Sequence, residues 1–206
     1  MAIVRLGVLL LTVFLSVTLV VAGCSRSPLL PPDVVKEVEE ALGYALAPTH
    51  LPKGLEFNKG GVKEIPKSPE WPDIPPLVEI IYSSSGDEPG GHGMLVFYPT
   101  EWPRNIGGPS GLETPEDAIS EIDVNGKTAY LTRGMWSEEA WSSLRETGVL
   151  PADAEWDYGT ITSLQFALDL PDGETIGVIL AVTPDPAAWI SDTELVRIAE
   201  SVGVID

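Results

Sequence analysis

Few residues of this 206-residue chain are of the types that catalyse reactions or bind metals. Its one Cys is Cys24, and its two His residues are His50 and His92. One Cys cannot form an intrachain disulfide or a cysteine-rich zinc site, and two His supply little material for a multi-histidine metal centre. The inventory therefore points away from thiol, disulfide and zinc chemistry.

An acidic segment near the middle of the chain resembles the start of a calcium loop. Asp153, Glu155 and Asp157 stand at alternate positions. An EF-hand loop also needs Gly at its sixth position and an acid at its twelfth, where this chain has Tyr158 and Leu164. We therefore expect a solvated acidic loop here, with no metal site.

Three other segments contain residue types that enzymes use, but none of them forms a complete catalytic motif. Residues 90–93 form a Gly-rich stretch around His92, without the Lys and the following helix that a phosphate loop needs. Pro109-Ser110-Gly111 does not fit a nucleophile elbow, which needs Gly both two positions before the Ser and two positions after it. His50 lies in a Leu-Pro-Lys-Gly context that favours a structural role. We expect no catalytic residue and no cofactor.

Tryptophan is the more suggestive residue type, with six copies. Trp189 precedes the last predicted helix and is expected to pack it on the sheet. The others fall in predicted loops or in residues 136–159, where Trp can stack on sugars or anchor a partner, or can simply pack as a large hydrophobe. The candidate partner or ligand contacts are Trp102, Trp136, Trp141 and Trp156.

Charge narrows the class of partner. The chain has 31 Asp plus Glu against 12 Lys plus Arg, a formal net charge of −19. An acidic domain repels phosphate backbones, so nucleic acid is not an expected partner.

The first 23 residues differ from the rest. Arg5 is their only charge, and Leu6–Ala22 is an apolar run of 17 residues. Val21-Ala22-Gly23-Cys24 follows and resembles the bacterial lipobox. This resemblance implies cleavage between Gly23 and Cys24 and attachment of diacylglycerol to the Cys24 thiol. The alternative is an uncleaved N-terminal helix, close to the lower length limit for a membrane span. Both place the domain outside the cytoplasm, tethered to the cell membrane.

Processing would define three regions: the signal peptide at 1–23, lipidated Cys24 with a Pro-rich tether at 24–32, and one domain at 33–206. Removing 23 of 206 residues leaves 183, with 11 basic and 31 acidic residues and a net charge of −20. The tether reaches about 25 Å at about 3.1 Å per residue, so we expect the domain to sit close to its membrane.

Periodicity and turn residues predict the elements of this domain. Asp33 is expected to cap a first helix, and Ser191 a last helix that Gly203 ends. Asn125-Gly126 predicts a tight hairpin. The expected helices cover 33–42, 137 to near 148, and 191–203, with a short helical start at 114–117. The expected strands cover 55–65, 77–83, 94–98, 122–124, 128–131, 161–170 and 175–183, with none in 136–159.

These elements indicate an α+β fold: a single two-layer domain with a mainly antiparallel sheet of about seven strands and helices from both ends packed on it. Three segments in this order resemble the uncharacterised domain family 4367, over about residues 45–203. They are Ala47–Phe57 (APTHLPKGLEF), Val124–Leu131 (VNGKTAYL) and Ile190–Val202 (ISDTELVRIAESV).

The resemblance implies an antiparallel sheet with a C-terminal helix, at the outer side of a bacterial membrane. It implies no catalytic residues. Residues 66–76 and 136–159 read as insertions, and the family's Trp-containing strand here reads Leu164-Gln165-Phe166.

Three functions follow in order of preference. The first is a non-enzymatic binding or protein-interaction module of the cell envelope, with an envelope protein or a glycan as partner. The second is a lipid or glycan carrier that uses an apolar face of the sheet. The third is an envelope hydrolase, which the missing nucleophile, metal set and cofactor loop disfavour.

Overall fold

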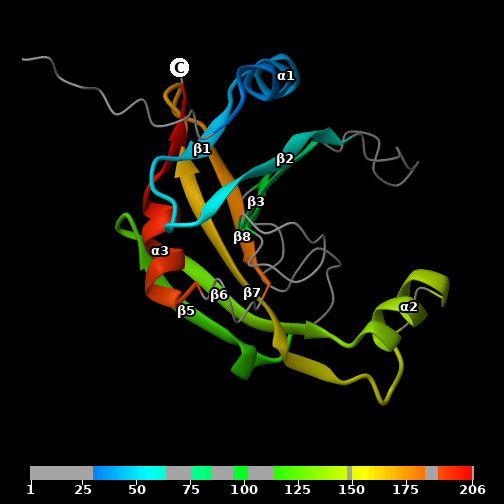
Figure 1. The fold of residues 1–206 in the computed structure, drawn as a ribbon. Helices are drawn as coiled ribbons and strands as arrows, with labels where there is room; N and C mark the ends of the chain where they lie inside the picture. Colours follow the sequence, from blue (N-terminus) through cyan, green and yellow to red (C-terminus); the bar gives the residue numbers. More distant parts are fainter. Residues whose placement is uncertain are drawn as a thin grey trace, which may run out of the picture.

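The computed structural model describes residues 30–63, 76–84, 95–101, 114–147, 150–183 and 190–205 (Figure 1). The helical elements in these ranges are α1 (Pro32–Leu42), the 3-10 turn η1 (Glu116–Ala118), α2 (Glu138–Thr147) and α3 (Asp192–Glu200). The strands are β1 (Leu46–Pro48), β2 (Leu55–Lys63), β3 (Leu77–Ser84), β4 (Leu95–Glu101), β5 (Ile119–Val124), β6 (Lys127–Trp136), β7 (Trp156–Asp169), β8 (Thr175–Val182) and β9 (Val202–Val204).

The described strands form two sheets. Seven of them hydrogen-bond in the order β2-β3-β4-β8-β7-β6-β5, and each pairing is antiparallel. β1 and β9 form a separate antiparallel ribbon. The expected α+β fold on a mainly antiparallel sheet is therefore confirmed. The β1–β9 ribbon was not predicted, because strands of three residues are too short to show an apolar period.

The predicted Asn125-Gly126 hairpin is confirmed. Asn125 and Gly126 have φ angles of 54° and 78°, the left-handed pair that a two-residue hairpin turn requires. Asp123 Oδ1 accepts a hydrogen bond from the Gly126 amide at 3.0 Å. Asn125 Nδ2 donates to the Glu200 carbonyl at 3.2 Å, so the same turn also holds the end of α3.

At the helix ends, two of the predicted end residues are confirmed and two are wrong. Ser191 Oγ accepts from the Glu194 amide at 3.2 Å, and Gly43 ends α1 with φ at 81°, both as expected. The prediction that Asp33 caps α1 was wrong: Pro31 holds the N-cap position, because Pro32 is preorganised for the first turn. The prediction that Gly203 ends the last helix was also wrong.

α3 ends earlier, with Ser201 as its C-cap, because the chain turns there to pair β9 with β1. Gly203 lies opposite Ala47 in that ribbon. Pairing between segments about 150 residues apart decided the end of the helix, and no local pattern reports such a pairing.

The main apolar cluster lies where the helices meet the sheet. α1 packs against β2, and α3 against β7 and β5. Val38 of α1, Ile198 of α3 and Phe166 of β7 are each at most 1% exposed and belong to one cluster. Burying an aliphatic side chain of this kind contributes roughly 1.5–3 kcal/mol. Leu30, just before α1, is 2% exposed in the same cluster.

α1 also protects one edge of the sheet. Glu37 Oε1 accepts a hydrogen bond from the Val62 amide of the edge strand β2 at 2.8 Å. This carboxylate occupies a backbone donor that would otherwise be available to another strand. The contact places α1 near the end of β2 at which Lys63 pairs with Leu77.

Candidate functional site

One part of the molecule projects from the rest of the sheet (Figure 1). β6 and β7 continue past the other strands, with Trp136 paired to Trp156, and α2 follows β6 at the far end. We call residues 134–160 the arm. The expected helix from Ser137 is confirmed as α2. The expectation of no strand within 136–159 was wrong, because β7 begins at Trp156 and its acidic stretch is held by pairing with β6 rather than by apolar alternation.

Gly134 forms the base of the arm. Its φ is 93°, and the β6–β7 register shifts between Arg133 and Met135, which marks a bulge. A Cβ at Gly134 would lie 2.5 Å from both the Asp157 carbonyl oxygen and Trp156 Nε1. Only glycine fits this position. Sequence reasoning missed Gly134, although an isolated Gly inside a strand pattern is the usual signal for a bulge.

Two of the four candidate tryptophans meet above this bulge. The Trp136 and Trp156 rings are edge-to-face, with centroids 5.3 Å apart and planes at 85°. Trp156 Nε1 donates to the Arg133 carbonyl at 2.9 Å. Trp136 Nε1 is enclosed and has no hydrogen-bond partner among the described residues. Both side chains are half-buried.

The other candidate contacts are not placed with this pair. Trp141 lies in α2, but its side chain is outside the described parts of the structure. Trp102, Trp71 and Trp189 lie outside the described residues altogether.

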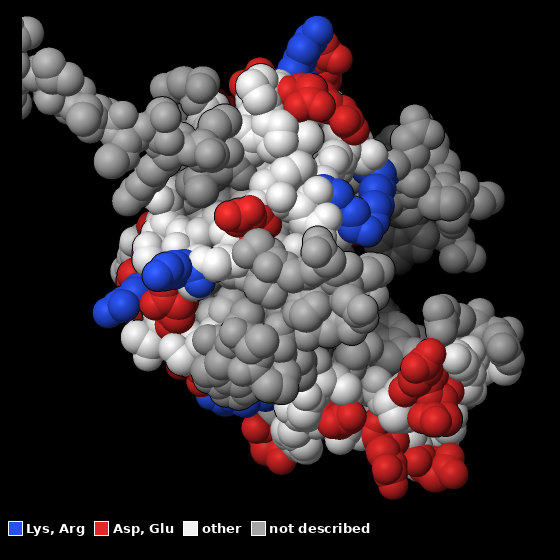
Figure 2. Space-filling model, viewed as in Figure 1, with Lys and Arg blue, Asp and Glu red and all other residues white. Residues whose placement is uncertain are grey.

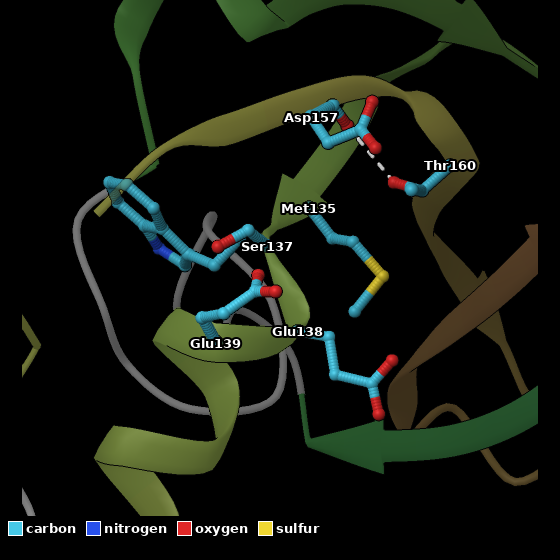
Figure 3. A pocket seen from close by; sticks show the side chains of 7 residues that line it. Met135, Ser137, Glu138, Glu139, Asp157 and Thr160 are labelled. Atoms are coloured by element: carbon cyan, nitrogen blue, oxygen red, sulfur yellow. Dashed lines mark hydrogen bonds between the residues drawn. The ribbon is translucent and has the colours of Figure 1, made fainter. Parts of the chain in front are cut away.

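A hollow of about 610 Å³ opens between the start of α2 and β7 (Figure 3). Figure 3 shows the Met135 side chain extending into the space between Glu138 and Thr160. The residues described along its lining are Met135, Trp136, Ser137, Glu138, Glu139, Asp157 and Thr160.

Hydrogen bonds fix one wall of the hollow. Asp157 Oδ1 accepts from the Gly159 amide at 2.8 Å, and Thr160 Oγ1 donates to the Asp157 carbonyl at 2.9 Å. On the opposite wall, the Ala140 amide donates to Ser137 Oγ at 3.3 Å. The first turn of α2 therefore has a side-chain cap, and exposed Glu138 lies beside its positive end.

The arm is strongly acidic. Residues 134–160 contain six acidic residues and one basic residue, Arg145, for a net charge of −5. In Figure 2, acidic side chains gather over the arm at the lower right, and the Lys and Arg atoms in view lie over the body of the domain. The exposed described acids of the arm are Glu138, Glu139, Asp153, Glu155 and Asp157.

The arm is joined to the body by polar contacts at its base. Arg133 pairs with Asp192 at the start of α3. Tyr158 is 51% exposed, and its hydroxyl donates to Asp117 Oδ2 at 2.9 Å. This hydrogen bond raises the pKa of the Tyr158 hydroxyl above its usual value, and desolvation and the Asp117 charge add to it.

The other residues that the sequence singled out lie away from the arm or outside the described ranges. His50 Nε2 lies 2.6 Å from Glu194 Oε1, and the His50 amide donates to Ser201 Oγ at 3.1 Å. These contacts join the segment after β1 to α3, as a structural role requires. Gly23, Cys24, His92 and Ser110 lie outside the described residues. Within the described ranges, no group of three or more His, Cys, Asp or Glu side chains is arranged to hold a metal ion.

Comparison of the chain with protein-family models, with curated proteins and with solved structures found no match. The resemblance to domain family 4367 therefore remains a prediction from three short segments. Of the helices that the structure describes, none has both the length and the apolar character needed to cross a membrane.

Proposed function

We propose that this protein is a lipid-anchored lipoprotein on the extracytoplasmic face of the cell membrane that acts as a non-enzymatic binding or interaction module. One observation carries the binding role: the arm presents two half-buried tryptophans and five exposed carboxylates outside the main apolar cluster. A segment that adds little to the core and exposes aromatic and charged groups is typical of a contact surface.

The anchoring part of the proposal rests on Cys24. The chain's only Cys stands directly after an apolar run and the small residues Ala22 and Gly23. A structural Cys has no reason to occupy that position, whereas lipid attachment requires it. A diacylglycerol with a further acyl chain gives stable anchoring, because a single chain binds membranes only marginally.

We further propose that residues 33–206 form a single domain of two layers, with helices on a sheet of about seven strands. This arrangement is supported by the apolar cluster that Val38 of α1 and Leu195 of α3 share with Leu164 of β7. The packed body would hold the arm in a fixed position relative to the anchor.

The hollow on the arm bears on the two alternatives. A lipid carrier needs an enclosed apolar cavity, and this open hollow is lined by Glu138, Glu139 and Asp157. A hydrolase of the glycosidase type uses a pair of carboxylates, and the activity test below distinguishes it from a binding module.

Substitution of the anchor residue tests the localisation. Cys24→Ser should give a product that is not lipidated, is processed abnormally and leaves the membrane fraction, whereas the neighbouring Ser25→Ala change should leave processing and fractionation unchanged. Mass spectrometry of the mature N-terminus and membrane fractionation measure both. A Cys24→Ser protein that is processed and membrane-bound like the wild type would contradict the proposal.

Crosslinking in the native cell tests the binding role. The anchored protein should form a discrete adduct with an envelope component. Hydrolysis of an envelope polymer by the purified protein, abolished by Glu139→Gln or Ser110→Ala, would instead establish the enzyme alternative.

A further inference from the structure

We propose that the hollow between the start of α2 and β7, whose lining residues we call the tip of the arm, binds a basic, Arg- or Lys-containing segment of another envelope protein, on the side of the domain that faces away from the membrane. This inference rests on the proposed lipid anchoring for its orientation. Its chemistry rests on the arm alone.

The anchor joins the domain at the end of the sheet opposite the arm. Leu30 and α1 are packed at the end of β2 where Lys63 pairs with Leu77. Ile80 of β3 pairs with Phe97 of β4, and Glu101 of β4 pairs with Ile176 of β8, so this end of β2 lies at the same end of the sheet as the β7–β8 turn. The chain therefore enters the domain at that end of the sheet.

The arm tip lies at the other end of β7. That strand runs from Asp169, which pairs with Thr175 beside the turn, to Trp156 at the tip, over 14 residues. At about 3.3 Å per residue, the two ends are roughly 40 Å apart. Cys24 and Leu30 are six residues apart, a span of about 20 Å at most. The tip thus lies farther from the entry point than the tether can extend.

Electrostatics favours the same orientation. The arm has a net charge of −5, and an anionic lipid surface repels acidic groups that approach within a Debye length. The tip is therefore better placed toward the envelope than against the lipid. An occupant of this surface is a component of the envelope and not a lipid headgroup.

The residues at the hollow define the chemistry of that occupant. Glu138, Glu139 and Asp157 supply carboxylates, and no described Lys or Arg side chain lies in the lining. Carboxylates form charge-assisted, often bidentate hydrogen bonds with guanidinium groups. Trp136 adds an aromatic surface on which a cation can stack.

Charge complementarity therefore favours a cationic polypeptide over the other ligands that Trp and carboxylates can take. A neutral glycan would use the ring of Trp136 but would gain little from the arm's net charge of −5. A calcium ion would need more oxygen ligands at one point than the described residues bring together.

The test uses full-length protein, processed in a bacterial membrane and purified in detergent, with labelled nona-arginine as the probe. We expect saturable binding that weakens as salt concentration rises. The tip variant Glu138→Gln/Glu139→Gln/Asp157→Asn should weaken binding by about 10-fold or more, and Trp136→Ala by about 3- to 30-fold. Asn at 157 can still accept from the Gly159 amide, so the wall of the hollow is preserved.

A matched control distinguishes binding at the tip from attraction to the overall negative charge of the domain. The variant Glu39→Gln/Glu40→Gln/Glu56→Gln removes the same three charges from exposed positions on α1 and β2. It should change binding by less than about twofold. Equal weakening in both triple variants would overturn the proposal, because it would show attraction to the acidic domain as a whole.

Three competitors test for the other ligands. Nona-citrulline, neutral muropeptide fragments and CaCl₂ at matched ionic strength should not displace the probe from the tip. Displacement by the muropeptides or by calcium, sensitive to Trp136→Ala or to the triple tip variant, would contradict a polypeptide site. Binding is measured on purified protein, so its failure leaves the Cys24 result intact, and failure of anchoring leaves the binding result intact.

Discussion

The body of this domain and its arm are stabilised in different ways. In the body, Leu195 and Ile198 of α3 are at most 1% exposed and share one cluster with the strands. In the arm, Gly134 and Ala140 are the only buried residues among those whose burial the structure describes. The body is held by aliphatic burial, and the arm by a glycine bulge, one Trp pair and polar contacts.

Under the proposed function, this difference separates the part of the molecule that stabilises the fold from the part that binds. Burial of aliphatic side chains lowers the free energy of folding, while exposed carboxylates and half-buried Trp rings contribute little to it. Ordering the arm costs conformational entropy, and the arm buries little apolar surface in return. The proposed binding role accounts for such a segment. The following experiments separate the two regions, in order of expected effect.

The largest effect should come from the core of the body. Ile198→Ala should lower the free energy of unfolding by about 2–5 kcal/mol, because it leaves a cavity beneath α3. Met135→Ala in the half-buried arm should cost about 1 kcal/mol or less. Urea unfolding measures both. Equal costs would show that the arm is packed as firmly as the body.

The next largest change in stability should come from substituting Gly134 at the bulge. Gly134→Ala should cost about 2–4 kcal/mol, since it combines a left-handed backbone with a Cβ 2.5 Å from the Asp157 carbonyl oxygen. Gly173 has a similar φ of 91° and open space around it, so Gly173→Ala should cost only about 1 kcal/mol.

Near-ultraviolet circular dichroism should report loss of the Trp pair in Gly134→Ala alone. If both glycine variants lose the same stability, or if the Trp signal survives in Gly134→Ala, the bulge does not set the geometry of the arm.

A smaller effect contrasts two polar aromatic groups. Trp156→Phe removes the hydrogen bond to the Arg133 carbonyl and should cost about 1 kcal/mol. Tyr82, in the body, is 0% exposed, and its hydroxyl has no partner among the described residues, so Tyr82→Phe should be neutral or stabilising. Thermal unfolding compares them. A destabilised Tyr82→Phe would show that the hydroxyl has an acceptor.

The smallest effects are pH-dependent and opposite in the two regions. Hydrogen bonds from Lys127 and Thr175 lower the pKa of the Asp169 carboxyl below its usual value of 3.8. A lowered acid pKa stabilises the fold above 3.8, and this stabilisation is lost as pH falls through the folded-state pKa. For Tyr158 the pKa is raised above 10.0, so its stabilisation is complete below 10.0 and is lost as pH rises through the folded-state value.

NMR titration can check both signs. The Asp169 carboxyl should titrate at lower pH than in Lys127→Met, and the Tyr158 ring at higher pH than in Asp117→Asn. A Tyr158 titration that Asp117→Asn leaves unchanged would show that the contact between the arm and η1 does not form in solution.

Local patterns predicted the parts of the fold that local chemistry decides. The Asn125-Gly126 turn, the Ser191 cap and the paired strands β7 and β8 follow from residues within a few positions of one another. The β1–β9 ribbon and the start of β7 were missed because distant pairing creates them. Asp33 was misassigned because Pro32 can begin a helix without a side-chain cap.

The candidate site was predicted only in part. Trp136 and Trp156 were chosen from their place in an acidic, aromatic segment, and the structure joins them. Their edge-to-face geometry depends on Gly134 and on the register shift beside it, which no residue count reveals. The hollow is lined by residues of β6, α2 and β7 that the bulge at Gly134 brings together, so its lining could not be listed from the sequence.

Site-specific photocrosslinking in living cells tests whether the tip of the arm is a contact surface of this protein, as we propose. A photoreactive residue at Glu139, in the hollow, should give a discrete adduct with an envelope protein, and the Glu138→Gln/Asp157→Asn background should reduce it. The same residue at exposed Glu39 on α1 should give no such adduct. An adduct at position 39 with none at position 139 would show that the arm tip is not the contact surface.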